Sequence, residues 1–179
     1  MSNVLIGIIG VILFIGLALA GALILGDDFK SASSSTQAAA AASQLQQVRA
    51  AAEMWKLKTG QSTILNQDTS FLVPRFLKVR AQNPTKLGMA NQTSYPHATR
   101  FNNDVCPDAT NEPGVVASHI QIALGTGAEG EAICQSLADT YSNGVMDYDV
   151  RPTRPMGCVK FDALQCGYSG VWYVAFATL

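Results

Sequence analysis

Four cysteines are the residues of this 179-residue chain whose type and number most directly suggest chemistry. Cys106, Cys134, Cys158 and Cys166 lie in its C-terminal half, and their spacing matches no zinc knuckle, redox pair or covalent haem motif. An even number of widely separated cysteines behind an apolar N-terminal segment favours two disulfides and an oxidising compartment. Four buried thiols in a cytosolic core are the alternative interpretation.

Other side chains that could catalyse a reaction or bind an ion are sparse. His97 and His119 are the only histidines, and no phosphate-binding loop, G-x-S-x-G elbow or H-E-x-x-H motif occurs. His119 belongs to an alternating stretch and is interpreted as a half-exposed strand residue. The oxygen-rich stretches 102–108 and 147–149 could offer ligands to Ca²⁺, but neither has EF-hand spacing. We therefore expect no enzymatic activity, no metal and no cofactor.

Composition and charge narrow the possible partners. The formal net charge is −1 and only 14% of residues are charged, without a basic stripe, so we expect no nucleic-acid partner. The chain is 48% hydrophobic, and much of that excess lies at its beginning. The remainder has the composition and length of one small domain.

The opening segment, Val4–Leu25, contains no charged or strongly polar side chain. As a helix rising ~1.5 Å per residue it would be ~33 Å long, enough for a ~30 Å hydrocarbon layer. Asp27 and Asp28 mark its end, because carboxylates are costly inside a bilayer. A cleaved leader usually has a basic residue before a shorter apolar run, whereas the first basic residue here is Lys30. We expect the segment to be retained; cleavage after Ala20 is the alternative.

Small residues recur along this segment. Its glycines and the pairs Gly16/Ala20 and Ala18/Ala22 would let helix backbones approach closely. This pattern predicts packing against copies of the same segment, although glycine is also common in single membrane helices. Glycine is a poor helix former, so a helix that softens and extends between Gly16 and Gly26 is a second prediction.

The elements that follow predict an α+β fold. Residues 37–58 lack Gly and Pro, and the apolar stripe of Leu45, Val48, Ala52 and Trp55 indicates an amphipathic helix that ends near Gly60. Beyond it, residue patterns predict a short helix or irregular segment at 71–73, a half-buried strand at 117–124, a helix at 129–141 and closing strands at 158–161 and 171–176.

An apolar N-terminal run that continues into an amphipathic helix and a small α+β head with late cysteines resembles a bacterial type IV pilin of the type IVb branch. The carrying stretches are Met1-Ser2 before the apolar run, residues 132–137 (AICQSL), and 164–167 (LQCG) leading into 172–176 (WYVAF). The resemblance implies a long N-terminal helix packed on an antiparallel-sheet head. It also implies a Cys134–Cys166 disulfide, which leaves Cys106–Cys158 as a second bridge.

The resemblance further implies a major structural subunit of an extracellular pilus-like helical filament. Residues 1–28 would form the filament core or a membrane anchor, 29–59 an amphipathic helix, and 60–179 the head. Implied partners are identical subunits, the inner membrane before assembly, and the pilus assembly machinery. A minor pilin or a membrane-anchored periplasmic binding or assembly domain is the alternative. The residues expected in the filament core are Val4, Leu5, Gly7, Ile8, Val11, Phe14, Gly16, Ala20 and Gly21.

Position five departs from the family pattern. The family has a glutamate there, which is thought to neutralise the N-terminal amine of a neighbouring subunit, whereas this chain has Leu5 and no carboxylate before Asp27. An amine buried without a partner is costly. The amine of Met1 is therefore expected to be methylated, bonded to carbonyl groups, or near solvent.

Overall fold

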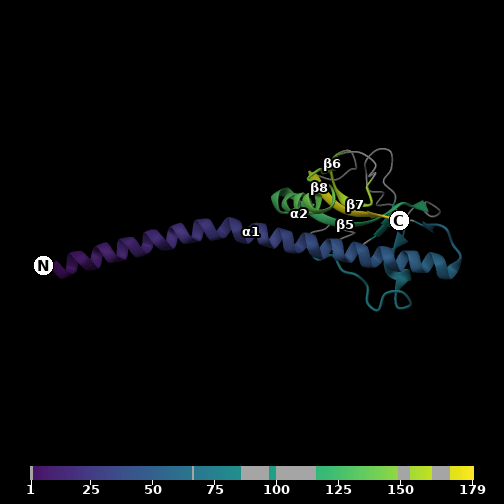
Figure 1. Cartoon of the computed structure of the whole chain (residues 1–179), viewed down its shortest axis with the longest axis horizontal. Coiled ribbons are helices and arrows are strands. Elements are labelled where there is room, and N and C mark those ends of the chain that lie inside the picture. The colour runs from purple at the N-terminus through teal and green to yellow at the C-terminus, as the bar shows by residue number, and fades with distance from the viewer. Residues whose placement is uncertain (1, 66, 86–96, 100–115, 149–153, 163–169) are drawn as a thin grey trace. The chain divides into compact units, whose positions relative to one another are not determined.

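A computed structural model describes residues 2–65, 67–85, 97–99, 116–148, 154–162 and 170–179. Side chains are described for most of these residues, with gaps at 2–6, 22–25, 27, 65–68, 97–99, 116, 147–148 and 161–162. The chain divides into two compact units, Met1–Ser33 and Ser34–Leu179. The predicted α+β class with a long N-terminal helix is confirmed (Figure 1).

Helix α1 spans Ser2–Thr59 without a break. It contains no proline, and the Ser-rich stretch at 31–36 is helical like its flanks. Gly60 ends it with a positive φ of 69°, a conformation that glycine adopts at little cost. The Thr59 hydroxyl donates a hydrogen bond to the Trp55 carbonyl over 2.8 Å, which satisfies one of the carbonyls left open at the helix end.

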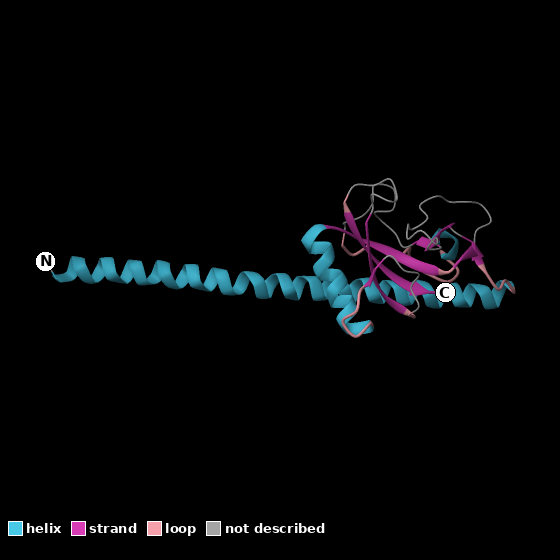
Figure 2. Cartoon of the chain, turned by 90° about the horizontal axis from the view of Figure 1, so that it is seen from above, coloured by secondary structure: helices cyan, strands magenta, loops and turns pink. Residues whose placement is uncertain are grey.

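The part of α1 in the second unit has the apolar face that the sequence predicted. Leu45, Val48 and Ala52 are at most 1% exposed, and Trp55 is partly buried against the same core. Alanines fill the remaining positions of this face, so the helix backbone lies close to its neighbours. Figures 1 and 2 show this part of α1 running alongside the β-sheet.

The main sheet has six strands in the order β2-β3-β5-β8-β7-β6. Its three long strands, β5, β8 and β7, are antiparallel, and β6 pairs with β7 in parallel. A separate pair joins β1 to β4. The bounds are β1 Ile64–Leu65, β2 Gln67–Asp68, the 3₁₀ helix η1 Thr69–Leu72, β3 His97–Thr99, β4 Val116–Ala117, β5 His119–Thr126, α2 Gly127–Tyr141, β6 Asp147–Tyr148, β7 Met156–Asp162 and β8 Val171–Thr178.

The strand predicted at 117–124 exists, but it is not half-buried. Seven of the eight residues of β5 are buried, including His119 and Gln121 at 3% exposure. Ile120 and Ile122 join the cluster that contains the α1 residues, while His119 lies edge-on to Phe176 of β8 on the other face. The polar residues suggested a solvent-facing side because sequence alternation alone does not reveal that both faces of a strand are covered.

Helix α2 begins two residues before the predicted start and ends at Tyr141 as predicted. Its buried face contains Ile133 and Leu137, which belong to the same core cluster as α1. The amide of Gly144 donates a hydrogen bond to the Ala138 carbonyl over 3.0 Å, and Gly144 has a positive φ of 78°. This is the glycine-terminated helix end that the sequence indicated.

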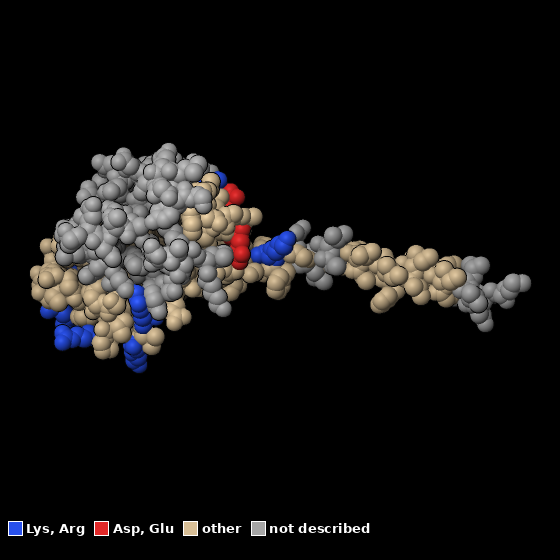
Figure 3. All heavy atoms as spheres, turned by 180° about the vertical axis from the view of Figure 1, so that it is seen from behind, with Lys and Arg blue, Asp and Glu red and all other residues tan. Residues whose placement is uncertain are grey.

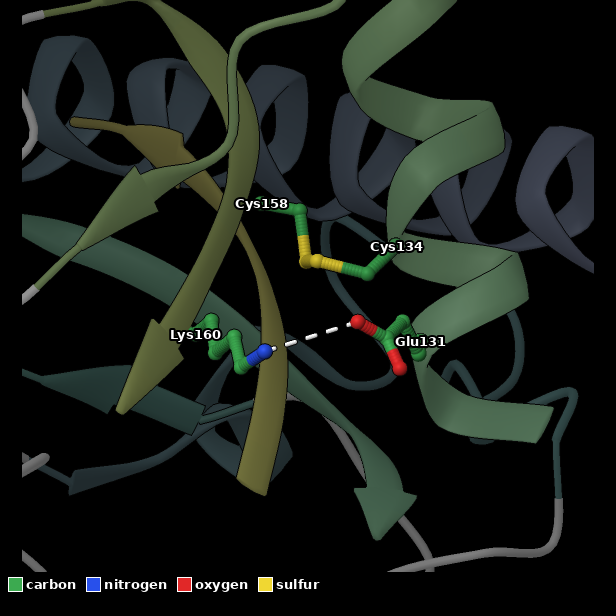
Figure 4. A network of polar contacts seen from close by, with 4 residues as sticks. All are labelled: Glu131, Cys134, Cys158 and Lys160. Carbon is green, nitrogen blue, oxygen red and sulfur yellow. Dashed lines mark hydrogen bonds and ion pairs between the residues drawn. A yellow bond between two sulfur atoms is a disulfide. The ribbon is translucent and has the colours of Figure 1, made fainter. Parts of the chain in front are cut away.

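The disulfide pairing implied by the resemblance is wrong. Cys134 of α2 is bonded to Cys158 of β7, not to Cys166, and Cys158 is therefore not available to Cys106 (Figure 4). Met156 and Cys158 are two positions apart in β7, so their side chains lie on the same face of the sheet, the face that packs against the helices. The Cys158 side chain is therefore directed toward α2. Cys106 and Cys166 lie outside the described residues.

Candidate assembly surface

The first unit exposes large apolar side chains along successive turns of α1. Nine of them between residues 8 and 19 are 50% to 73% exposed. They are Ile8, Ile9, Val11, Ile12, Leu13, Phe14, Ile15, Leu17 and Leu19. We call this set the apolar collar.

The apolar collar surrounds the helix rather than following one side. At about 100° per residue, its nine side chains leave no angular gap wider than about 60° around the axis. The described side chains of residues 7–21 carry no charge, as Figure 3 shows for one face. A helix that is apolar all round requires an apolar surround on every side.

Glycines on the same stretch have no packing role in the described part of the chain. A Cβ atom placed at Gly7, Gly10, Gly16 or Gly21 would have no atom within 4 Å. Ala20 is exposed like the collar, and between residues 16 and 20 small and large side chains alternate along the sequence. The glycine positions therefore have open space around them in the single chain.

The predicted core residues Val4 and Leu5 belong to α1, but their side chains lie outside the described set. The first turn of α1 has no acidic residue, consistent with leucine at position five. Within the residues whose placement is described, no helix is long and apolar enough to cross a membrane. The extension of the helix predicted between Gly16 and Gly26 concerns the chain within a polymer. In the single chain α1 is continuous over these residues.

An ion pair lies beside the disulfide, between the same two elements (Figure 4). The Lys160 ammonium of β7 lies 3.4 Å from a Glu131 carboxylate oxygen of α2, and 5.6 Å from the centre of the Tyr173 ring. Burial raises the pKa of Tyr173 above its usual value, and the negative Glu131 raises it further, while the positive Lys160 opposes both. The disulfide and the ion pair both connect α2 to β7, so together they act as a structural clamp.

The residues considered for catalysis and ion binding do not form such a site in the described part of the chain. The His119 ring is buried, and its Nδ1 lies 2.6 Å from the Ser118 hydroxyl oxygen. Asp147 and Tyr148 form β6, whereas the other oxygen-rich stretch and His97's side chain are outside the described set. Among the described side chains, no three potential metal ligands come together.

A recess at the C-terminal end of α1 was not predicted from the sequence. It has a volume of about 520 Å³ and lies between the last turn of α1 and the segment around Pro74. We call it the aromatic recess; its lining residues are Trp55, Lys58, Thr59, Phe71, Val73, Pro74, Arg75 and Phe76. The available signal in the sequence was Arg75 and Phe76 directly after Pro74, with Phe71 three positions before the proline.

Comparison with known proteins does not identify the chain. No protein-family model, curated protein or solved structure matches it.

Proposed function

We propose that this chain is the major structural subunit of an extracellular helical filament similar to a type IV pilus. The first units of many copies pack together as the core of the filament, and the second units form its outer surface. Assembly is the function of the protein.

The observation that carries this proposal is the apolar collar. Leaving nine large apolar side chains in water on every side of one helix is unfavourable by about 25 cal/mol for each Å² of apolar surface. A single partner on one side would cover only part of the collar. A bundle of identical helices covers all of it, and each copy supplies the same surface that it needs.

The glycines favour the same arrangement. Helices that meet in an apolar surround are held by close packing rather than by water exclusion, and small residues permit that approach. Because Gly10, Gly16 and Gly21 have open space around them in the single chain, a neighbouring helix can approach there without displacing any described atom.

The second unit suits an exposed position outside the cell. It has its own core, and the Cys134–Cys158 disulfide holds α2 on the sheet. Disulfides persist in oxidising compartments and are rare in the cytosol. A head fastened in this way resists unfolding when the filament is pulled or sheared.

The proposal is tested by shearing cells that produce the full chain and imaging the released material. We expect regular fibres that contain the chain. The matched variants are Ile12→Lys in the apolar collar and Val79→Lys in the second unit, since both side chains are exposed apolar residues. Only Ile12→Lys should abolish the fibres, because it places a charge in the packed core.

Recovery of the wild-type chain solely as a monomer in the membrane fraction would overturn the filament and favour the alternative of a membrane-anchored periplasmic domain. Fibres made equally well by the Ile12→Lys variant would also contradict a core formed by the apolar collar.

A further inference from the structure

The aromatic recess has a fixed aromatic wall. The rings of Trp55 and Phe71 meet edge to face with 5.3 Å between their centres. The amides of Phe76 and Leu77 both donate hydrogen bonds to the Leu72 carbonyl, over 2.9 and 3.0 Å, which holds the turn that carries Phe76. The recess is therefore formed before a partner binds, and little conformational entropy is lost when it is filled.

Two positive charges line the recess. Lys58 and Arg75 are exposed, and in the described part of the chain neither has an ion-pair partner, because the nearby Glu53 carboxylate pairs with Lys56 at 3.3 Å. In Figure 3, Lys and Arg side chains gather at one end of the second unit, with no described Asp or Glu among them on that face. The recess suits an apolar or aromatic group that carries a negative charge.

The chain itself contains such a group in the first unit. Phe29 is 76% exposed, among the most exposed large apolar side chains described, and the exposed Asp28 precedes it directly. Phe29 belongs to the first unit and Trp55 to the second, and we assign the occupant to a second copy of the chain.

We propose that the aromatic recess binds the Asp28–Phe29 pair of a second copy of this chain. The phenyl ring enters among the aromatic side chains, and the Asp28 carboxylate pairs with Lys58 and Arg75. Aromatic rings favour such edge and offset contacts, and charged groups in complementary places fix register. A volume of about 520 Å³ accommodates the ring together with part of the helix that carries it.

This inference rests on the proposed filament. The apolar collar alone has no side chain that distinguishes one axial offset between helices from another. A contact between Asp28–Phe29 and the aromatic recess selects one offset, so it determines which pairs of subunits touch.

A charge-swap series in the full chain tests the contact. Asp28→Lys, and Lys58→Asp combined with Arg75→Asp, should each reduce the yield of sheared filaments by about tenfold, because like charges then face each other. Combining all three substitutions should restore the yield. Lys78→Asp, an exposed basic residue that does not line the recess, is the matched control and should leave the yield unchanged. Thermal unfolding of each detergent-solubilised variant should equal that of the wild type, since all four side chains are exposed.

Carbodiimide treatment of wild-type filaments provides a direct readout. It joins a carboxylate to an amine in contact, so we expect a linked peptide that contains Asp28 and Lys58. Wild-type filaments without this link, or a triple variant that assembles no better than the single swaps, would overturn the recess contact and leave the filament intact. Normal filament yield from the Asp28→Lys variant would likewise overturn the recess contact and leave the filament intact. A wild-type chain that forms no filaments would overturn the filament and the contact together.

Discussion

Cys134 on α2 and Cys158 on β7 are joined by a disulfide, with 5.5 Å between their Cα atoms and a sequence separation of 24. A cross-link of this span stabilises a fold by about 3 to 4 kcal/mol in the chain-entropy description. We expect a Cys134→Ser/Cys158→Ser double variant to lose a free energy of unfolding of this size in urea denaturation of the full chain in detergent.

Peptide mapping without reduction checks the pairing itself. A fragment that contains Cys134 linked to one that contains Cys158 is expected, and reduction before digestion serves as the control. A Cys134–Cys166 link would contradict the structure and support the pairing that the resemblance implied.

Leu45 and Leu57 offer a matched pair on one helix. Leu45 is fully buried in the core, whereas Leu57 is 84% exposed. We expect Leu45→Ala to lower the free energy of unfolding by about 2 to 5 kcal/mol, because it leaves a cavity. Leu57→Ala should change it by less than about 0.5 kcal/mol. Equal effects in chemical denaturation would show that α1 does not contact the sheet through the Leu45 face.

The ionisation of Tyr173 lowers the free energy of unfolding at alkaline pH. Its pKa is raised from the usual 10.0, first by burial, so the folded state retains the phenolic proton when the unfolded state loses it. The contribution of Tyr173 is therefore complete below pH 10 and decreases as the pH rises above that value. Urea denaturation between pH 8 and pH 11 should show a steeper loss for the wild type than for Tyr173→Phe. Parallel curves would mean that the phenol is already solvated in the folded state.

Gly16 tests the packing of the proposed filament core. Gly16→Ala keeps a small side chain and should assemble like the wild type. Gly16→Leu should reduce the yield of sheared filaments by about tenfold, because a large side chain prevents close approach of helix backbones. No described atom lies within 4 Å of a Cβ at this position, so both variants should match the wild type in thermal unfolding. Equal assembly by both would show that helices do not meet at Gly16.

Local patterns predicted the helices of the second unit well. The stripe from Leu45 to Trp55 and the buried face of α2 both repeat at helical spacing, and Gly60 and Gly144 mark the ends where their positive φ values are needed. Such signals depend on neighbouring residues, which the sequence displays directly.

Features that depend on distant residues were not accessible in this way. The choice of Cys158 over Cys166 is set by which face of β7 packs against α2, and the burial of Gln121 by a second covered face of the sheet. The aromatic recess likewise combines the last turn of α1 with the segment around Pro74. Each requires the tertiary arrangement before it can be recognised.

The position of β8 has a consequence for biosynthesis. β8 follows every other described strand in the sequence, yet it lies between β5 and β7 and is hydrogen-bonded to both. While a ribosome is still making residues 171–178, β5 and β7 lack the strand that joins them. The central part of the sheet therefore forms only after residues 171–178 have emerged, and β5 and β7 remain unjoined until then.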